Sequence, residues 1–173
     1  MSDQIRVLYT EQEVDARINE VAEMINRDYA GKEVHLICVL KGGVFFTTEL
    51  SKRITLPVSF DFMSVSSYGD GTKSSGVIRI VKDLDHALEG KHVLIVEDII
   101  DSGRTLSHLV KLLKNRHPES LEICTLLDKP DRREAEVDVK YTCFTIPDTF
   151  IVGYGLDYAQ KYRNLPYIGE VIL

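Results

Sequence analysis

The sequence predicts a single α/β domain built on a mainly parallel, twisted sheet flanked by helices. Short apolar runs alternate with amphipathic helical segments along the chain, which is typical of βαβ units. The length of 173 residues suits one domain, and no repeat, low-complexity tract or Pro/Gly/Ser-rich linker divides residues 1–173. In such sheets ligands bind beyond the carboxyl ends of the strands, so the loops at those ends are the first place to seek function.

The first half of the chain opens with a clear helix signal. Thr10 and Glu13 have the spacing of a capping box, and apolar residues at helical spacing follow, so we expect a helix over residues 11–29 that ends at Gly31. Pro57 marks the start of a later strand. The other elements expected here are a strand at 34–40, a helix at 44–53, a strand at 58–65, a turn-rich segment at 66–76 and a strand at 77–81.

The second half continues the alternation of strands and helices. A β-rich run at 92–96 precedes a helix whose apolar side chains are Leu106, Leu109, Val110 and Leu113. Later apolar runs cover 121–127, 141–146 and 150–154. Four strand ends carry polar or glycine-rich loops, and we expect a ligand site where these meet: 41–43, 97–105, 128–130 and 153–157.

Composition excludes several classes of protein. With 21 Lys and Arg against 27 Asp and Glu the net charge is -6, which disfavours binding to nucleic acid or anionic membranes. The apolar runs are too short to span a bilayer, and MSDQIRVLYT lacks the apolar core of a signal peptide. Cys38, Cys124 and Cys143 form no CxxC pair and are expected to be buried, reduced thiols. We therefore expect a cytoplasmic protein.

The most informative segment is VEDIIDSGRTL at residues 96–106, which joins an apolar strand to an amphipathic helix. Its small, polar portion at 101–105 can surround an anion with backbone N–H groups at the start of the helix. Glu97 and Asp98 can accept hydrogen bonds from vicinal sugar hydroxyls or hold a hard cation. The segment matches neither GxxxxGK[ST] nor GxGxxG. Alternatively, Asp98 and Asp101 only cap the helix.

This segment resembles the loop that binds phosphoribosyl pyrophosphate (PRPP) in the type I phosphoribosyltransferases. The resemblance extends over nearly the whole chain and points to the 6-oxopurine branch of that family. It is carried by LKGG at 40–43, SSYG at 66–69, LLDKP at 126–130 and FIVGYGLDYAQKYRNLPYIG at 150–169, all in the expected order. It implies the type I phosphoribosyltransferase fold, with a small hood formed by the N- and C-terminal segments.

The resemblance assigns PRPP to two loops. Glu97 and Asp98 match residues that hold the ribose hydroxyls, and the residues after them match the cradle of the 5′-phosphate. The pyrophosphate is assigned to Leu40-Lys41-Gly42, where the peptide bond before the lysine is often cis in this family, and to Arg163. The full set implied for PRPP is Lys41, Gly42, Glu97, Asp98, Asp101, Ser102, Gly103, Arg104, Thr105 and Arg163.

The resemblance also assigns a purine site. Lys129 matches a lysine that donates to the 6-oxo group, and a cationic donor prefers that carbonyl over the amine of adenine. Phe150 matches an aromatic residue that stacks on the purine, Ile151 contributes backbone groups to the purine edge, and Asp157 completes the set. In isolation, Lys129 reads as a surface lysine paired with Asp131.

Catalysis is assigned by the resemblance to one carboxylate and one moving loop. Asp101 matches the proposed general base facing N7 of the purine. Ser67 and Tyr68 match a mobile flap at about 66–76 that closes over the site, and the composition of that segment suits a mobile loop. A plain hairpin connection is the alternative for this segment.

The implied reaction is purine salvage with Mg²⁺ as cofactor. The 5-phosphoribosyl group of PRPP would move to N9 of hypoxanthine or guanine, with xanthine as a further candidate, giving IMP, GMP or XMP and pyrophosphate. The resemblance implies metal contacts from Glu97, Asp98 and Asp157, and Mg²⁺ commonly keeps several waters and takes few protein ligands. Relatives are usually homodimers or homotetramers.

Two other functions stay open at this point. A transferase for another base would share the PRPP loop, although Lys129 and Phe150 favour a 6-oxopurine. The fold also occurs in RNA-binding regulators, which need a basic surface that a net charge of -6 disfavours.

Overall fold

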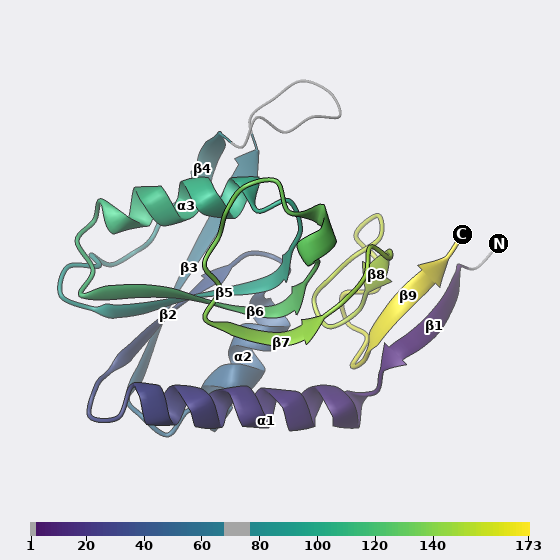
Figure 1. Ribbon diagram of the computed structural model, residues 1–173, viewed down its shortest axis with the longest axis horizontal. Helices are drawn as coiled ribbons and strands as arrows, with labels where there is room; N and C mark the ends of the chain where they lie inside the picture. The colour runs from purple at the N-terminus through teal and green to yellow at the C-terminus, as the bar shows by residue number, and fades with distance from the viewer. Residues whose placement is uncertain (1–2, 68–76) are drawn as a thin grey trace.

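The computed structural model describes residues 3–67 and 77–173. It contains a large central sheet with helices on both faces and a small separate sheet at one end (Figure 1). Most of the expected flap, Tyr68 included, lies outside the described residues.

The central sheet has six strands in the order β4-β3-β2-β5-β6-β7. All neighbouring pairs are parallel except β3 and β4, which are antiparallel. This confirms the predicted α/β class with a mainly parallel sheet. The strands are β2 (Val34–Val39), β3 (Val58–Ser67), β4 (Ile78–Lys82), β5 (His92–Ile100), β6 (Ser120–Asp128) and β7 (Tyr141–Thr145).

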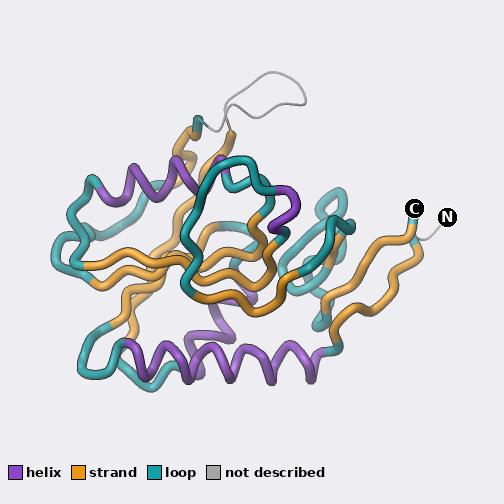
Figure 2. The backbone as a smooth tube through the Cα atoms, viewed as in Figure 1, coloured by secondary structure: helices purple, strands orange, loops and turns teal. Residues whose placement is uncertain are grey.

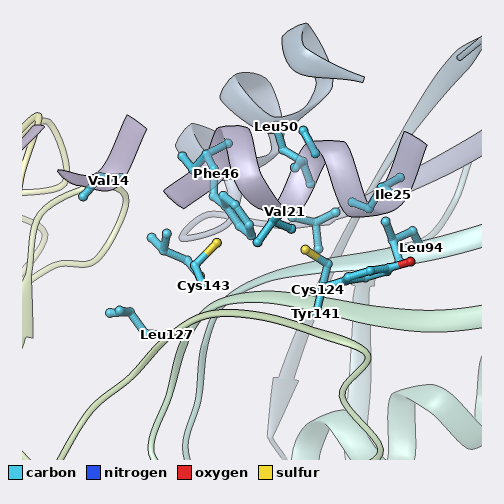
Figure 3. Packing of buried hydrophobic residues seen from close by; sticks show 14 of the residues in the cluster. Val14, Val21, Ile25, Phe46, Leu50, Leu94, Cys124, Leu127, Tyr141 and Cys143 are labelled. Atoms are coloured by element: carbon cyan, nitrogen blue, oxygen red, sulfur yellow. The ribbon is translucent and has the colours of Figure 1, made fainter. Parts of the chain in front are cut away.

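The helices cover the two faces of this sheet. Helices α1 (Glu11–Asp28) and α2 (Val44–Arg53) pack on one face, and α3 (Arg104–Lys114) packs on the other (Figure 1). Thr10 caps α1 with both hydrogen bonds of the predicted capping box. Alternate residues of β5 enter the two cores, as Leu94 packs with α1 and α2 while Ile95 packs with α3. Figure 3 shows the first of these cores, with Phe46 and Leu50 of α2 facing α1.

The small sheet is the predicted hood. Strand β1 (Gln4–Tyr9) pairs antiparallel with β9 (Ile168–Ile172), which pairs antiparallel with β8 (Ile151–Val152). The first and last strands of the chain therefore lie side by side at one end of the molecule, as the tube in Figure 2 shows. The predicted apolar run at 150–154 forms only the two-residue β8, because the chain bends at Gly153 and returns through two isolated bridges.

The three cysteines are buried and form no disulfide, as predicted. Within residues 3–67 and 77–173, no helix is long and apolar enough to cross a membrane.

Strand β5 is longer than predicted and includes Glu97 and Asp98. The sequence suggested a strand that ends at Val96, because charged residues follow it. In the structure β6 continues to pair with β5 as far as Ile100, opposite Asp128. These backbone hydrogen bonds hold the two acidic residues in an extended strand.

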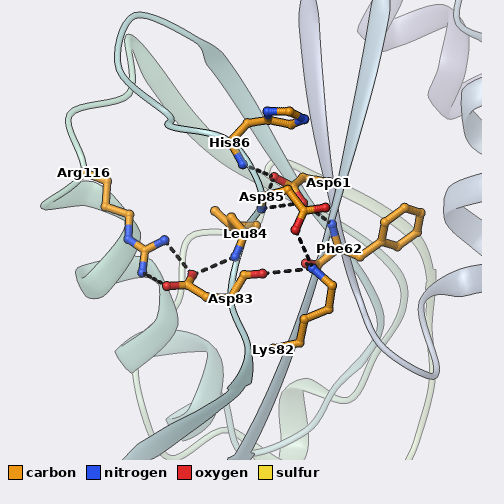
Figure 4. A network of polar contacts seen from close by, with 8 residues as sticks. All are labelled: Asp61, Phe62, Lys82, Asp83, Leu84, Asp85, His86 and Arg116. Atoms are coloured by element: carbon orange, nitrogen blue, oxygen red, sulfur yellow. Dashed lines mark hydrogen bonds and ion pairs between the residues drawn. The ribbon is translucent and has the colours of Figure 1, made fainter.

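A buried carboxylate anchors the loop that follows β4. Asp61 of β3 is only 2% exposed and accepts hydrogen bonds from the backbone N–H groups of Phe62, Asp85 and His86 (Figure 4). Burial alone raises the pKa of a carboxyl group, but the three backbone donors outweigh it and lower the pKa of Asp61. Asp61 therefore ties β3 to the segment that leads from β4 into β5.

We expect Asp61→Asn to lower the free energy of unfolding at pH 7 by about 1–3 kcal/mol, because an amide cannot accept all three hydrogen bonds as an ionised carboxylate does. Since the pKa of Asp61 is lowered in the folded state, its contribution is complete above the unfolded pKa. It is lost as the pH falls through the folded pKa. The difference between wild type and variant, measured by urea unfolding, should shrink from pH 7 toward pH 3.

The matched control is Asp85→Asn in the same loop, where the side chain is 70% exposed and its one ionic partner among the described residues is Lys82. We expect a change within about 0.5 kcal/mol. Equal destabilisation by the two variants would show that the buried hydrogen bonds of Asp61 are not what holds the loop.

Candidate active site

The site begins where β2 and β5 separate. β5 pairs with β2 only as far as Cys38 opposite Val96, whereas its pairing with β6 continues to Ile100. The last residues of β5 therefore have a free edge on the side of β2. A cleft of about 280 Å³ lies there, and it joins the segments predicted for PRPP. It is lined by Val39, Leu40, Gly42, Val65, Glu97, Asp98, Ile99, Ile100, Asp101, Ser102, Gly103, Thr105 and Leu106.

The loop after β2 reaches β5 across this cleft. The Leu40–Lys41 peptide bond is cis, as the family resemblance implied, and Lys41 itself is exposed. Gly42 lies against Asp98 so closely that a Cβ at residue 42 would come within 1.8 Å of the Asp98 Oδ2 atom. Only glycine fits between this loop and β5 without displacing that carboxylate.

The loop at 101–105 leads directly into α3. Gly103, which has no side chain, is the N-cap of α3 with φ 78°, in the left-handed region that favours glycine. The alternative that Asp98 and Asp101 cap the helix is therefore wrong. The Arg104 N–H donates to Ser102 Oγ at 3.3 Å. Thr105 Oγ1 lies 3.1 Å from Ser67 Oγ, so the predicted phosphate loop touches the first part of the predicted flap.

Glu97 and Asp98 place two adjacent carboxyl groups in this cleft, and the pKa of each is raised. Burial raises the pKa of Glu97 well above its usual range, and the neighbouring Asp98 charge raises it further. Burial also raises the pKa of Asp98, while the backbone N–H of Ile99 and the charge of Arg163 oppose that rise. Two adjacent carboxylates in this environment favour hydroxyl donors or a cation beside them.

A second hollow, of about 510 Å³, adjoins the cleft and contains all the residues predicted for the purine. Asp101 and Ile99 line both hollows. Lys129, Phe150, Ile151 and Asp157 line only the second, which we call the base pocket. The ring of Phe150 is 43% exposed and meets Tyr158 edge-on, with the ring centroids 5.3 Å apart.

Lys129 is the least exposed charged group of the base pocket. The residue is only 8% exposed, and its Nζ donates to the Thr149 carbonyl at 2.6 Å. It also lies 3.5 Å from the Asp148 carboxylate. The alternative of a surface lysine paired with Asp131 is therefore wrong.

Asp157 and Arg163 form one unit on the hood side of the site. Their side chains pair at 3.3 Å, and Arg163 also donates to the Gly155 carbonyl at 2.7 Å. Asp157 lines the base pocket, whereas Glu97 and Asp98 line the cleft. Within the described ranges no group of three or more His, Cys, Asp or Glu side chains is arranged to hold a metal ion.

Several residues of the base pocket were not foreseen. These are Arg132 and Asp148, which add two charges to its lining, and Thr149 beside Asp148. Ile99 and Leu156 complete the lining from the loops at 97–105 and 153–157, where a ligand site was expected. Asp148 and Thr149 directly precede Phe150, and Arg132 is three residues beyond Lys129. Proximity to a predicted site residue was the only signal in the sequence.

Comparisons with known proteins agree with this geometry. The family model of the phosphoribosyl transferase domain matches residues 6–159. Hypoxanthine-guanine phosphoribosyltransferase of Mycobacterium avium is 54% identical, covering 95% of this chain and 84% of that protein. Hypoxanthine phosphoribosyltransferase of Salmonella typhimurium is 49% identical, covering 100% and 98% respectively. A crystal structure of hypoxanthine-guanine phosphoribosyltransferase from Bacillus anthracis matches with a TM-score of 0.95 and 44% identity, covering 99% and 100%.

The structure has a mainly parallel sheet with a terminal hood. Asp101 lines both the cleft and the base pocket, and it belongs to the loop at 101–105, which we call the anion loop after the ligand predicted for it. Together with the family match, these features identify a phosphoribosyltransferase. At about half identity over nearly the full length of its relatives, the chain belongs to the hypoxanthine phosphoribosyltransferase family within that class. Its expected fold is thereby confirmed.

We expect Gly42→Ala to weaken the binding of inorganic pyrophosphate at least tenfold, because the new Cβ would displace Asp98 or the loop after β2. Isothermal titration of pyrophosphate with Mg²⁺ would measure this. The control is Gly31→Ala, whose φ of 79° strains the backbone but whose Cβ would meet nothing within 4 Å, far from the cleft. Unchanged binding in Gly42→Ala would contradict the tight fit.

Proposed function

We propose that this chain transfers the 5-phosphoribosyl group of PRPP to N9 of hypoxanthine or guanine, and to xanthine as a further candidate. The products would be IMP, GMP or XMP and pyrophosphate. The observation that carries this proposal is that Asp101 lines both the base pocket and the cleft between β2 and β5, which we call the anion cleft. A general base at that junction can reach a purine and the ribose to which the purine is joined.

The cleft supports binding of PRPP by three sets of groups. The N–H groups and hydroxyls of the loop at 102–105 would receive the 5′-phosphate at the start of α3. Glu97 and Asp98 would accept hydrogen bonds from the ribose hydroxyls. Lys41 and Arg163 would neutralise the pyrophosphate, with the Gly42 backbone beside it.

The base pocket supports recognition of a 6-oxopurine. Lys129 already uses one donor on Thr149 and would offer another to the 6-oxo oxygen. Phe150 would stack on the ring, and Ile151 would contribute backbone groups to its edge. Asp157 would lie at the same pocket, held by Arg163.

In the reaction, the bond between C1 of the ribose and pyrophosphate breaks as the lone pair of N9 forms the new bond to C1. Positive charge then develops on the imidazole ring of the purine. Asp101 would accept the proton from N7, which leaves a neutral base in the nucleotide product. Closure of the flap over the site would exclude water, which otherwise hydrolyses PRPP.

Magnesium fits the chemistry of the cleft. Glu97 and Asp98 would supply two carboxylate oxygens. Burial raises the pKa of both groups, and a cation bound beside them would stabilise their ionised forms. A small number of protein ligands is enough for Mg²⁺, because the ion keeps several waters and also binds the phosphate oxygens of the substrate. When bound, it would supply charge neutralisation for the leaving pyrophosphate. Asp157 lines the base pocket and not the cleft, so it would contact the Mg²⁺ ion from the side of the base pocket.

We further propose a cytoplasmic homodimer or homotetramer. Three buried, unpaired cysteines suit a reducing compartment. Exposed aromatic rings support self-association: Phe60 and Phe62 stack on the surface of β3, and Phe45 of α2 is 38% exposed next to the Lys41 loop. Nucleic acid and membranes are not among the proposed partners.

An assay with PRPP and Mg²⁺ tests this function, offering hypoxanthine, guanine, xanthine, adenine and uracil separately. We expect turnover of hypoxanthine and guanine, little turnover of adenine and uracil, and loss of activity with EDTA that returns on adding Mg²⁺. Binding of PRPP without turnover of any base would overturn the enzymatic proposal in favour of a regulatory binding protein.

We expect Asp101→Asn to lower kcat with hypoxanthine about 100-fold or more, since loss of a general base typically costs that much. The affinity for PRPP, measured by isothermal titration, should change less than threefold because the loop backbone is retained. Equal losses in kcat and in PRPP affinity would contradict the role of Asp101 as general base.

A further inference from the structure

Four charged side chains of alternating sign link the two groups proposed to recognise the purine. Lys129 Nζ lies 3.5 Å from Asp148, Asp148 lies 3.3 Å from Arg132 Nη1, and Arg132 Nε lies 3.1 Å from Asp101. All four side chains line the base pocket. We call this set the charged chain. Its two end members already have roles in the proposed reaction, and its two middle members do not.

The two end members of the charged chain, Lys129 and Asp101, would hydrogen-bond to neighbouring atoms of the base. In the proposed function, Lys129 donates to the 6-oxo oxygen and Asp101 accepts from N7. These two atoms lie on the same edge of a 6-oxopurine, one as an acceptor and the other as a donor. The relative placement of Lys129 and Asp101 therefore determines whether both contacts form at once.

Asp148 is the ionic partner of a largely buried cation. Lys129 is only 8% exposed, and Asp148 is the one carboxylate within 4 Å of its Nζ among the described residues. The second contact of Nζ is the neutral Thr149 carbonyl at 2.6 Å. Together these contacts fix the direction of the ammonium group and offset its desolvation.

Arg132 is the ionic partner of Asp101, as Asp148 is of Lys129. Its Nε donates to Asp101 Oδ1 at 3.1 Å, and its Nη1 donates to Asp148 Oδ2 at 3.3 Å. The hydrogen bond to Asp101, followed by the charges of both carboxylates, raises the pKa of Arg132. A planar guanidinium that holds two carboxylates at once limits the rotation of both.

We propose that Asp148 and Arg132 are positioning residues for the phosphoribosyl transfer, with Asp148 acting through Lys129 and Arg132 acting through Asp101. This inference rests on the proposed function. Neither residue needs to touch the reacting atoms. Because the side chains of Arg132, Asp101 and Asp148 are about half exposed, solvent weakens each link, and we expect effects of about threefold to fivefold.

The two residues should affect different kinetic constants. Lys129 would contact the base in the bound complex and in the transition state alike, so Asp148→Asn should raise KM for hypoxanthine about threefold to fivefold with kcat nearly unchanged. Asp101 would act as charge develops on the ring, so Arg132→Gln should lower kcat by a similar factor. Arg132→Lys should restore part of that loss, since it keeps the positive charge.

A double-mutant cycle tests the proposed route of action. We expect Arg132→Gln to lower kcat about threefold to fivefold in wild type but less than 1.5-fold in the Asp101→Asn background. The control is Arg116→Gln, which removes an arginine that lies just beyond the C-terminal end of α3 and binds Asp83 (Figure 4). That variant should leave kcat and KM unchanged.

An equal loss from Arg132→Gln in both backgrounds would overturn the inference, as would an equal loss in Arg116→Gln. An unchanged KM for hypoxanthine in Asp148→Asn would overturn the part that concerns Lys129. Thermal unfolding of each variant separates positioning from destabilisation. Failure of the wild-type protein to convert any base would instead refute the proposed function.

Discussion

The separation of β2 from β5 after the Cys38–Val96 pair is the constraint on which the site depends. Because β6 continues to pair with β5 as far as Ile100, the backbone of β5 stays extended after its pairing with β2 has ended. Glu97 and Asp98 lie on this free edge, and the Leu40–Lys41–Gly42 turn reaches back to them. A parallel sheet thus opens a binding cleft by ending one strand before its neighbour.

The sequence predicted what depends on neighbours along the chain. The capping box at Thr10 was enough to predict the start of α1. The alternation of apolar runs with amphipathic segments was enough to predict the strands of the central sheet. The residues predicted for PRPP between Glu97 and Thr105 are contiguous in the sequence, so their composition was visible without a structure. The residues predicted for the purine were chosen because the family resemblance connected distant segments, and the structure gathers Lys129, Phe150, Ile151 and Asp157 into one pocket.

What the sequence could not supply depends on contacts between distant segments. The end of β5 is set by pairing with β6, which no local pattern around Val96 reveals. The burial of Lys129 depends on Thr149, twenty residues later, whose carbonyl receives its ammonium group. Arg132 looks like an ordinary exposed residue in sequence, and only the folded chain brings its guanidinium to Asp101.

The segment that begins at Lys129 also braces the anion loop. The N–H groups of Glu134 and Ala135 donate to the Ser102 carbonyl at 2.9 and 3.1 Å, and the Lys129 N–H donates to the Ile100 carbonyl at 3.0 Å. Backbone hydrogen bonds therefore connect the base pocket and the anion cleft on both sides of Asp101. A displacement at one hollow must be transmitted to the other or break these bonds. If PRPP orders this backbone, it lowers the entropic cost of binding the base, and by linkage the base must strengthen the binding of PRPP equally.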